Sequence, residues 1–114
     1  GDTTLVKLNA IFQDVLKRQE EKVDPIRSKF GKIEKEEITL SDRMIYIQRY
    51  ARHNGKFSFR NLLEKQSTKV EIIVTFLGVL ELMKVSVIKI EQNGLFEDIQ
   101  IEFTGKEVDL SEWE

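Results

Sequence analysis

The sequence has no cysteine, one histidine and one proline among its 114 residues. Without cysteine the chain cannot form a disulfide, a thiolate zinc site or a cysteine nucleophile. The single histidine, His53, precedes Asn54-Gly55 at the predicted end of a helix, where the helix dipole favours a solvated imidazole. A glycine-rich phosphate loop is also missing. We therefore expect a protein that is not an enzyme, with no catalytic residue, no metal site and no cofactor.

The sequence also lacks any run of about 18 consecutive apolar residues, the length that suggests a membrane span. We expect no contact with a membrane and a cytoplasmic location. Its 18 basic and 20 acidic residues give a net charge of −2, so no global field attracts phosphates. Only residues 105–114 are biased, which predicts an acidic C-terminal tail. What the chain does have is 40% hydrophobic residues, enough for one core and one flanking element.

Apolar residues at helical spacing predict a helix over residues 4–21. They are Leu5, Leu8, Ile11, Phe12, Val15 and Leu16. Asp24-Pro25 should stop this helix, because proline lacks an amide donor and restricts the residue before it. Residues 26–40 predict at most one short strand, around 32–38. Since this proline-bounded, charge-rich segment separates it from the rest, we expect helix 4–21 to contribute little to the core of residues 38–104.

Three helices and two strands are predicted after that segment. The first helix covers residues 41–52 with Ser41 as its N-cap, and a short second helix follows Ser58. Thr68 and Glu71 have the spacing of a capping box at the start of a helix over 69–84. Apolar residues on either side of Asn93-Gly94 predict a hairpin. The predicted fold class is mainly α with a small β-hairpin, a winged helix-turn-helix domain preceded by an N-terminal helix.

Helix 69–84 carries apolar side chains over an arc of roughly 220°, about twice the ~100° stripe that a surface helix needs. We predict that one part faces the domain core: Val70, Ile73, Val74 and Leu77. The other part should face a partner: Ile72, Phe76, Leu80 and Met83, with Val79 at the margin. The remaining positions, predicted to be exposed, are Glu71, Thr75, Gly78 and Glu81. In the alternative interpretation, helices 4–21 and 41–52 cover both apolar faces.

The helix and the hairpin loop are both poorly suited to read DNA. A DNA-reading third helix presents basic and amide side chains, whereas the predicted exposed positions of helix 69–84 are acidic. The predicted wing, residues 92–98, is acidic as well and carries Leu95 and Phe96 at its tip. A DNA-binding winged-helix transcription regulator is therefore the second hypothesis, and a small enzyme is the third.

Four stretches together resemble a known family, the bacterial kleisin subunit called segregation and condensation protein A. They are EITLSDRMIYI (37–47), FRNLLE (59–64), VTFLGVLELMK (74–84), and IEQ (90–92) with LFEDI (95–99). The sequence departs from the family at Glu97, where glycine is frequent, and at Val85-Ser86, where a polar or glycine-containing turn is frequent. The resemblance implies that residues 1–36 are the end of the kleisin middle region and that residues 37–104 are the winged-helix domain, and the charge-biased residues 105–114 form the acidic tail after them.

The resemblance implies a non-enzymatic subunit of the bacterial SMC complex, which acts in chromosome condensation and segregation at the nucleoid. In the family, the winged helix docks on the SMC ATPase head through its third helix, and the region upstream binds segregation and condensation protein B. Phe76 and Leu80 match the apolar positions of that helix. The expected head interface is Ile72, Phe76, Val79, Leu80 and Met83, with Leu95 and Phe96 in the wing.

We predict that the protein does not bind duplex DNA sequence-specifically at physiological salt. The net charge and the acidic residues of helix 69–84 offer too few cations to neutralise phosphates. Fluorescence anisotropy with labelled duplexes would measure this, and nanomolar binding to one sequence at about 150 mM salt would contradict the prediction.

Overall fold

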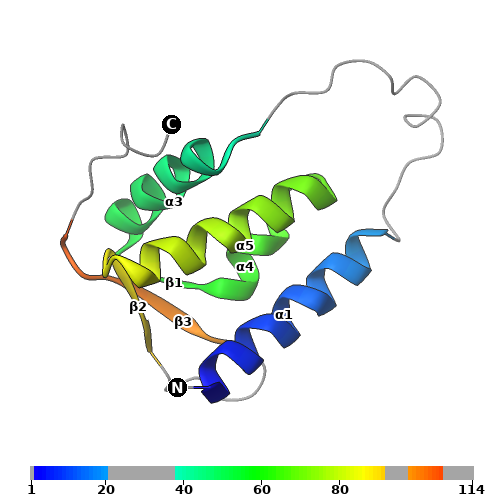
Figure 1. Cartoon of the computed structure of the whole chain (residues 1–114), viewed down its shortest axis with the longest axis horizontal. Coiled ribbons are helices and arrows are strands. Elements are labelled where there is room, and N and C mark those ends of the chain that lie inside the picture. Colours follow the sequence, from blue (N-terminus) through cyan, green and yellow to red (C-terminus); the bar gives the residue numbers. More distant parts are fainter. Residues whose placement is uncertain (1, 21–37, 92–97, 107–114) are drawn as a thin grey trace.

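The computed structural model describes residues 2–20, 38–91 and 98–106 (Figure 1). Its elements, in chain order, are α1 (Asp2–Glu20), α3 (Leu40–Asn54), β1 (Lys56–Ser58), α4 (Phe59–Glu64), α5 (Lys69–Lys84), β2 (Ile88–Glu91) and β3 (Gln100–Phe103). Some predicted features fall wholly or mostly on residues outside the described ranges: the stop at Asp24-Pro25, the strand near 32–38, the turn at Asn93-Gly94, the wing tip with Leu95 and Phe96, and the acidic tail of residues 105–114. None of the described helices is long and apolar enough to cross a membrane.

Local capping fixes where the helices begin. The Ser58 hydroxyl accepts a hydrogen bond from the Asn61 amide at 3.0 Å, which confirms the predicted cap of α4. The Thr68 hydroxyl likewise accepts from the Glu71 amide, and the Glu71 carboxylate reaches back to the amide of the residue before Thr68. The N-cap of α3 was predicted wrongly. Thr39 is the cap, because its hydroxyl accepts from the Asp42 amide at 3.1 Å, while Ser41 lies buried inside the first turn.

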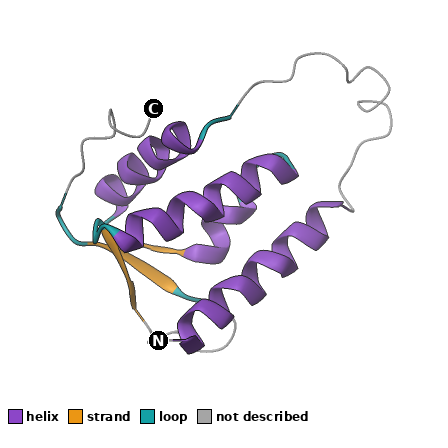
Figure 2. Ribbon diagram, in the orientation of Figure 1, coloured by secondary structure: helices purple, strands orange, loops and turns teal. Residues whose placement is uncertain are grey.

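The strands form one antiparallel sheet in the order β1-β3-β2 (Figure 2). The two predicted strands are β2 and β3, in which Ile90 faces Ile101. β1 was not predicted, and it places the buried Phe57 opposite the same Ile101. Together with α3, α4 and α5, this sheet confirms the predicted fold class, a mainly helical winged helix-turn-helix domain with a small sheet.

The central helix, α5, packs against α3 through small side chains. Thr75 is fully buried, and a Cβ added at Gly78 would lie 2.8 Å from Ile47 Cδ1 of α3. Glycine thus lets the two helices approach closely, because any larger side chain would meet Ile47. The prediction that Thr75 and Gly78 are exposed is wrong, since both are buried and Gly78 lies against Ile47 of α3.

The predicted division of α5 into a core face and a partner face is wrong at five of its residues, and the other four, Val74, Phe76, Leu80 and Met83, are half-buried. Ile72 and Val79, placed on the partner face, are fully buried. Val70, Ile73 and Leu77, placed in the core, are 57%, 39% and 46% exposed. The doubled apolar arc is therefore real, with one half in the core and the other half at the surface.

Helix α1 belongs to the same core as the winged helix. Leu8, Ile11 and Val15 are buried, and Phe12 stacks on Phe76 of α5 with ring centroids 4.3 Å apart. The expectation that this helix contributes little to the core is wrong. The proline-bounded segment separates α1 from the other helices along the chain, but α1 lies alongside α5 in space and buries its apolar stripe there (Figure 1).

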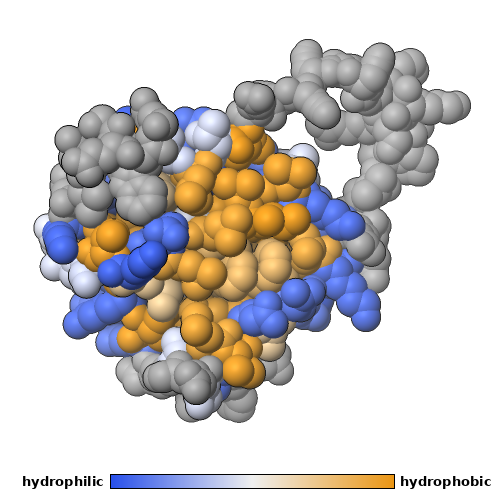
Figure 3. Space-filling view, viewed as in Figure 1, coloured by the Kyte–Doolittle hydropathy of each residue, from blue (hydrophilic) through white to orange (hydrophobic). Residues whose placement is uncertain are grey.

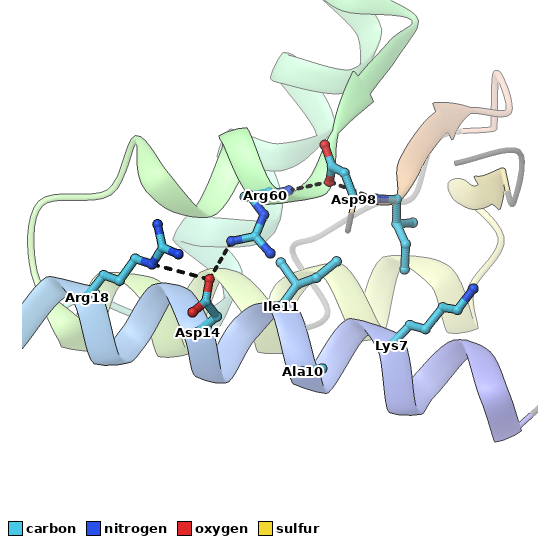
Figure 4. Close-up of a pocket in the computed structure, with 8 residues that line it drawn as sticks. Lys7, Ala10, Ile11, Asp14, Arg18, Arg60 and Asp98 are labelled. Carbon is cyan, nitrogen blue, oxygen red and sulfur yellow. Dashed lines mark hydrogen bonds and ion pairs between the residues drawn. The ribbon is translucent and has the colours of Figure 1, made fainter. Parts of the chain in front are cut away.

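An ion pair between Asp14 of α1 and Arg60 of α4 also connects these two helices (Figure 4). Arg60 donates to Asp14 with its Nη1 2.6 Å from Oδ2, and Arg18 lies one helical turn along α1 from the same carboxylate. The hydrogen bond from Arg60 is the largest effect and lowers the pKa of Asp14. Desolvation, the next largest, raises it, and the charges of Arg18 and Arg60 add to the lowering, so the pKa lies below its ordinary value.

We predict that Leu8→Ala destabilises the whole domain by about 2–5 kcal/mol, because it removes a fully buried side chain from the shared core. Urea unfolding followed by circular dichroism would give the free energy of unfolding. The matched control is Val6→Ala on the same helix, whose side chain is 65% exposed and whose change should stay within about 0.5 kcal/mol. Equal, small effects of both variants would show that α1 is not part of the core.

We further predict that Asp14 contributes to the acid sensitivity of the fold. Its folded-state pKa lies below the ordinary value, so its contribution is complete at neutral pH and is lost as the pH falls through that pKa. The free energy of unfolding, measured from pH 7 to about pH 3, should therefore fall less steeply in Asp14→Asn than in the wild type. Arg60→Gln should flatten the profile similarly, because it removes the same pair. Wild-type slopes in both variants would contradict this.

Candidate partner-docking surface

A cavity beside the Asp14–Arg60 pair gathers several charged groups (Figure 4). It has a volume of about 340 Å³ and lies between α1, α4 and the start of β3. Its second carboxylate, Asp98, accepts hydrogen bonds from the Ser58 hydroxyl and from the amides of Arg60 and Ile99. Both carboxylates are therefore already occupied by neighbouring donors. The carboxylates of this cavity connect α1, α4 and the start of β3 by hydrogen bonds, and neither is free to act as one of a pair of catalytic carboxylates.

No group of three or more His, Asp or Glu side chains in the described part of the chain is placed to hold a metal ion. His53 lies exposed in the last turn of α3, as its sequence position predicts.

The exposed half of α5 is apolar: among the described residues it carries three of the five large hydrophobic side chains that are exposed, and the other two, Leu5 and Val6, lie on α1. Val70, Ile73 and Leu77 are spaced by three and four residues, so they form one line along the helix, which we call the α5 stripe. Figure 3 shows hydrophobic side chains gathered over the middle of this face, where α5 lies between α3 and α1. Single exposed aliphatic residues are normal on proteins, but a continuous apolar surface is typical of a protein-binding site.

The residues predicted for the interface lie mostly behind or beside the α5 stripe. Ile72 and Val79 are fully buried and cannot reach a partner while the domain is folded. Phe76 is half-buried, with its ring 4.3 Å from Phe12 and 5.9 Å from Phe59. Leu80 and Met83 are also half-buried against the core, and the wing residues Leu95 and Phe96 lie outside the described ranges.

The positions of the apolar residues around helix α5 do not by themselves show which half faces inward, because both halves are apolar. The informative signal is the pair Thr75 and Gly78, small residues that permit close helix packing. Their spacing of three residues puts them on one side of the helix, and that side faces α3.

A second surface, which the sequence analysis did not single out, lies on α3. Tyr46 and Tyr50 are one turn apart with ring centroids 6.2 Å from each other, and they line a cavity of about 580 Å³ with Arg49 and Lys65. Phe57 of β1 supports Tyr50 edge-on at 5.0 Å, and the Lys65 ammonium lies 5.9 Å from the same ring. We call Tyr46, Arg49, Tyr50 and Lys65 the α3 aromatic face.

The lysines on the sheet are engaged with carboxylates. Lys56 of β1 pairs with Glu91 of β2 at 3.0 Å, and this hydrogen bond raises the pKa of Lys56. Lys89 lies 3.8 Å from Glu102 on the neighbouring strand. Paired lysines beside an apolar α5 face are poorly suited to phosphate contacts, which weakens the hypothesis of a DNA-binding regulator.

A sequence model of the family described as segregation and condensation protein ScpA matches residues 2–104. The chain is 31% identical over 101 residues to segregation and condensation protein A of Clostridium tetani. It is 36% identical over 106 residues to the protein of that name from Brevibacillus brevis, and 42% identical over 72 residues to that from Halothermothrix orenii. No solved structure matches the chain.

The matched regions differ in how much of each protein they include. The Clostridium and Brevibacillus matches cover 89% and 93% of this chain but only 40% of each relative, and the Halothermothrix match covers 61% of this chain and 30% of that relative. The chain thus spans about two-fifths of the length of the first two proteins. Because the family model extends over both α1 and the winged helix, this chain belongs to the segregation and condensation protein ScpA family, as the resemblance predicted.

Proposed function

We propose that this chain is the SMC-head-binding domain of a non-enzymatic kleisin subunit that acts in chromosome condensation and segregation. Membership of the ScpA family supports the general role, since its curated relatives are named for segregation and condensation. The observation that carries the docking proposal is the α5 stripe, an apolar line on the third helix of the winged-helix domain that the domain's own core does not cover.

Burial of the α5 stripe gives this docking its driving force. Covering a large aliphatic side chain removes apolar area from water and stabilises a complex by about 1.5–3 kcal/mol when burial is complete. Val70, Ile73 and Leu77 are already partly covered, so each can supply a fraction of that value. Ile72 and Val79 on the opposite face of α5 are fully buried in the core, so the helix is already fixed in place. Binding therefore costs little backbone conformational entropy.

The half-buried residues of the earlier interface prediction have an indirect role in this proposal. Phe76 positions α5 by packing between the rings of Phe12 and Phe59. Leu80 borders the α5 stripe and supplies an edge contact, because it is partly exposed while it packs on the core.

The other partners belong to the same proposal. The curated relatives are more than twice as long as this chain, so a complete subunit has room for a site that binds segregation and condensation protein B upstream of the winged helix. A subunit held by an SMC head would be associated with the nucleoid through that complex and would need no DNA contacts of its own.

We predict that Ile73→Arg and Leu77→Arg each weaken binding to an isolated SMC head domain by at least about 30-fold, equivalent to ~2 kcal/mol. Each variant places a charge at the centre of the apolar contact, where desolvation without a partner is costly. Isothermal titration calorimetry would measure affinity, and circular dichroism melts should remain close to those of the wild type, because both side chains point outward.

Two further variants separate docking from folding. Val6→Arg on α1 is the matched control, because it adds the same charge at an exposed apolar position away from α5 and should leave binding unchanged. Phe76→Arg should instead unfold the domain, since its ring packs between two others. Folded Ile73→Arg and Leu77→Arg variants that bind normally would exclude the α5 stripe from the interface.

A further inference from the structure

The α3 aromatic face has no covering element among the described residues, although it has the composition of a binding surface. Tyrosine and arginine are enriched at the centres of protein interfaces, where a rigid amphipathic ring costs little conformational entropy on binding. Here Tyr46 and Tyr50 are fixed in advance. Arg43 lies 4.4 Å from the ring centroid of Tyr46, Gln66 donates to its hydroxyl at 3.3 Å, and Phe57 packs against Tyr50.

The rim of the same cavity is predominantly basic. Arg49 and Lys65 are exposed on it, and Asp42 is the one acidic residue among those that line it. A cavity with aromatic walls and a basic rim favours a segment that combines an apolar or aromatic anchor with carboxylates.

The chain itself contains such a segment close by. Residues 107–114 hold four acidic residues, no basic residue, and the anchors Leu110 and Trp113. The described chain leaves β3 beside the C-terminal end of α3, because the Phe103 amide donates to the Gly55 carbonyl at 2.8 Å and Gly55 caps α3 (Figure 1). His53 and Asn54, the last residues of α3, line the cavity.

The tether is also long enough. Eight extended residues reach roughly 26 Å, at about 3.3 Å per residue. Helix α3 has 15 residues and is therefore roughly 22 Å long, at about 1.5 Å per residue. The anchors Leu110 and Trp113 follow Lys106 by four and seven residues, so they reach roughly 13 and 23 Å. Tyr50 lies five residues before the Gly55 cap, or roughly 8 Å along the helix, which is within the reach of both anchors.

We propose that residues 107–114 bind the α3 aromatic face of the same chain, with Leu110 or Trp113 in the cavity and the carboxylates beside Arg49 and Lys65. A short tether gives an effective concentration of about 1 mM, so even a weak contact is substantially occupied. The bound segment would shield the face from other acidic segments, which would have to displace it. This inference is independent of the α5 stripe, which lies on a different helix.

Trp113 provides a direct test, because it is the one tryptophan in the sequence. Acrylamide quenching of its fluorescence would be measured in the full 114-residue chain and in a free peptide of residues 106–114. A segment that is at least half bound should show a quenching constant at least about twofold lower in the chain than in the peptide. The difference should shrink in 1 M salt, since screening weakens the charge pairs.

Charge-reversal variants locate the contact. Arg49→Glu combined with Lys65→Glu should raise the quenching constant to the value of the peptide, with the fold retained by circular dichroism. The matched control, Lys7→Glu with Lys17→Glu on α1, makes the same change in net charge at exposed positions and should have no effect.

Three outcomes would overturn the proposal. In the first, Trp113 in the wild-type chain is quenched as readily as in the peptide. In the second, the two charge-reversal pairs alter quenching equally, which shows a dependence on net charge alone. In the third, quenching decreases with protein concentration, which shows that the segment binds a second copy of the chain.

Discussion

The packing of Phe76 against Phe12, on which it stacks, and against the tilted ring of Phe59 is the contact on which the rest of the structure depends. It joins three helices, since the rings come from α5, α1 and α4. Aromatic pairs of this kind stabilise a core beyond the area that they bury. By holding this side of α5 against α1 and α4, while Gly78 admits α3 on another side, the cluster fixes which half of α5 remains at the surface. The α5 stripe is thus a consequence of how the core is packed.

Helix α5 has one face in the core and one face at the surface, and both faces carry apolar residues. The inward half uses small or well-fitting side chains such as Thr75 and Ile72, whereas the outward half keeps large aliphatic residues such as Leu77 in contact with water. A helix with no partner would gain solubility from polar residues at those outward positions. Their apolar character is therefore the feature that most needs a functional explanation, and docking provides one.

Features set by local chemistry were largely predictable from the sequence, with the N-cap of α3 as an exception, and several features set by distant contacts were not. Caps at Ser58 and Thr68 depend on hydrogen bonds three residues away, so spacing alone revealed them. β1 spans only Lys56–Ser58 and exists because β3 pairs with it, which local propensity could not indicate. Which half of α5 faces inward depends on the packing of α1 against α5, a contact between segments far apart in the sequence. The α3 aromatic face escaped notice because Phe57 and Lys65 reach Tyr50 from other elements.

The position of α1 in the shared core has a mechanical consequence. Tension applied to the chain at the start of α1 acts on the packing of Leu8 and Phe12 and on the Asp14–Arg60 pair before it reaches residues 21–37. The helix lies alongside α5, so such a load would shear many side-chain contacts at once. Resistance to that load is set by the rate at which the core opens, because α1 cannot separate from α5 without breaking the shared core.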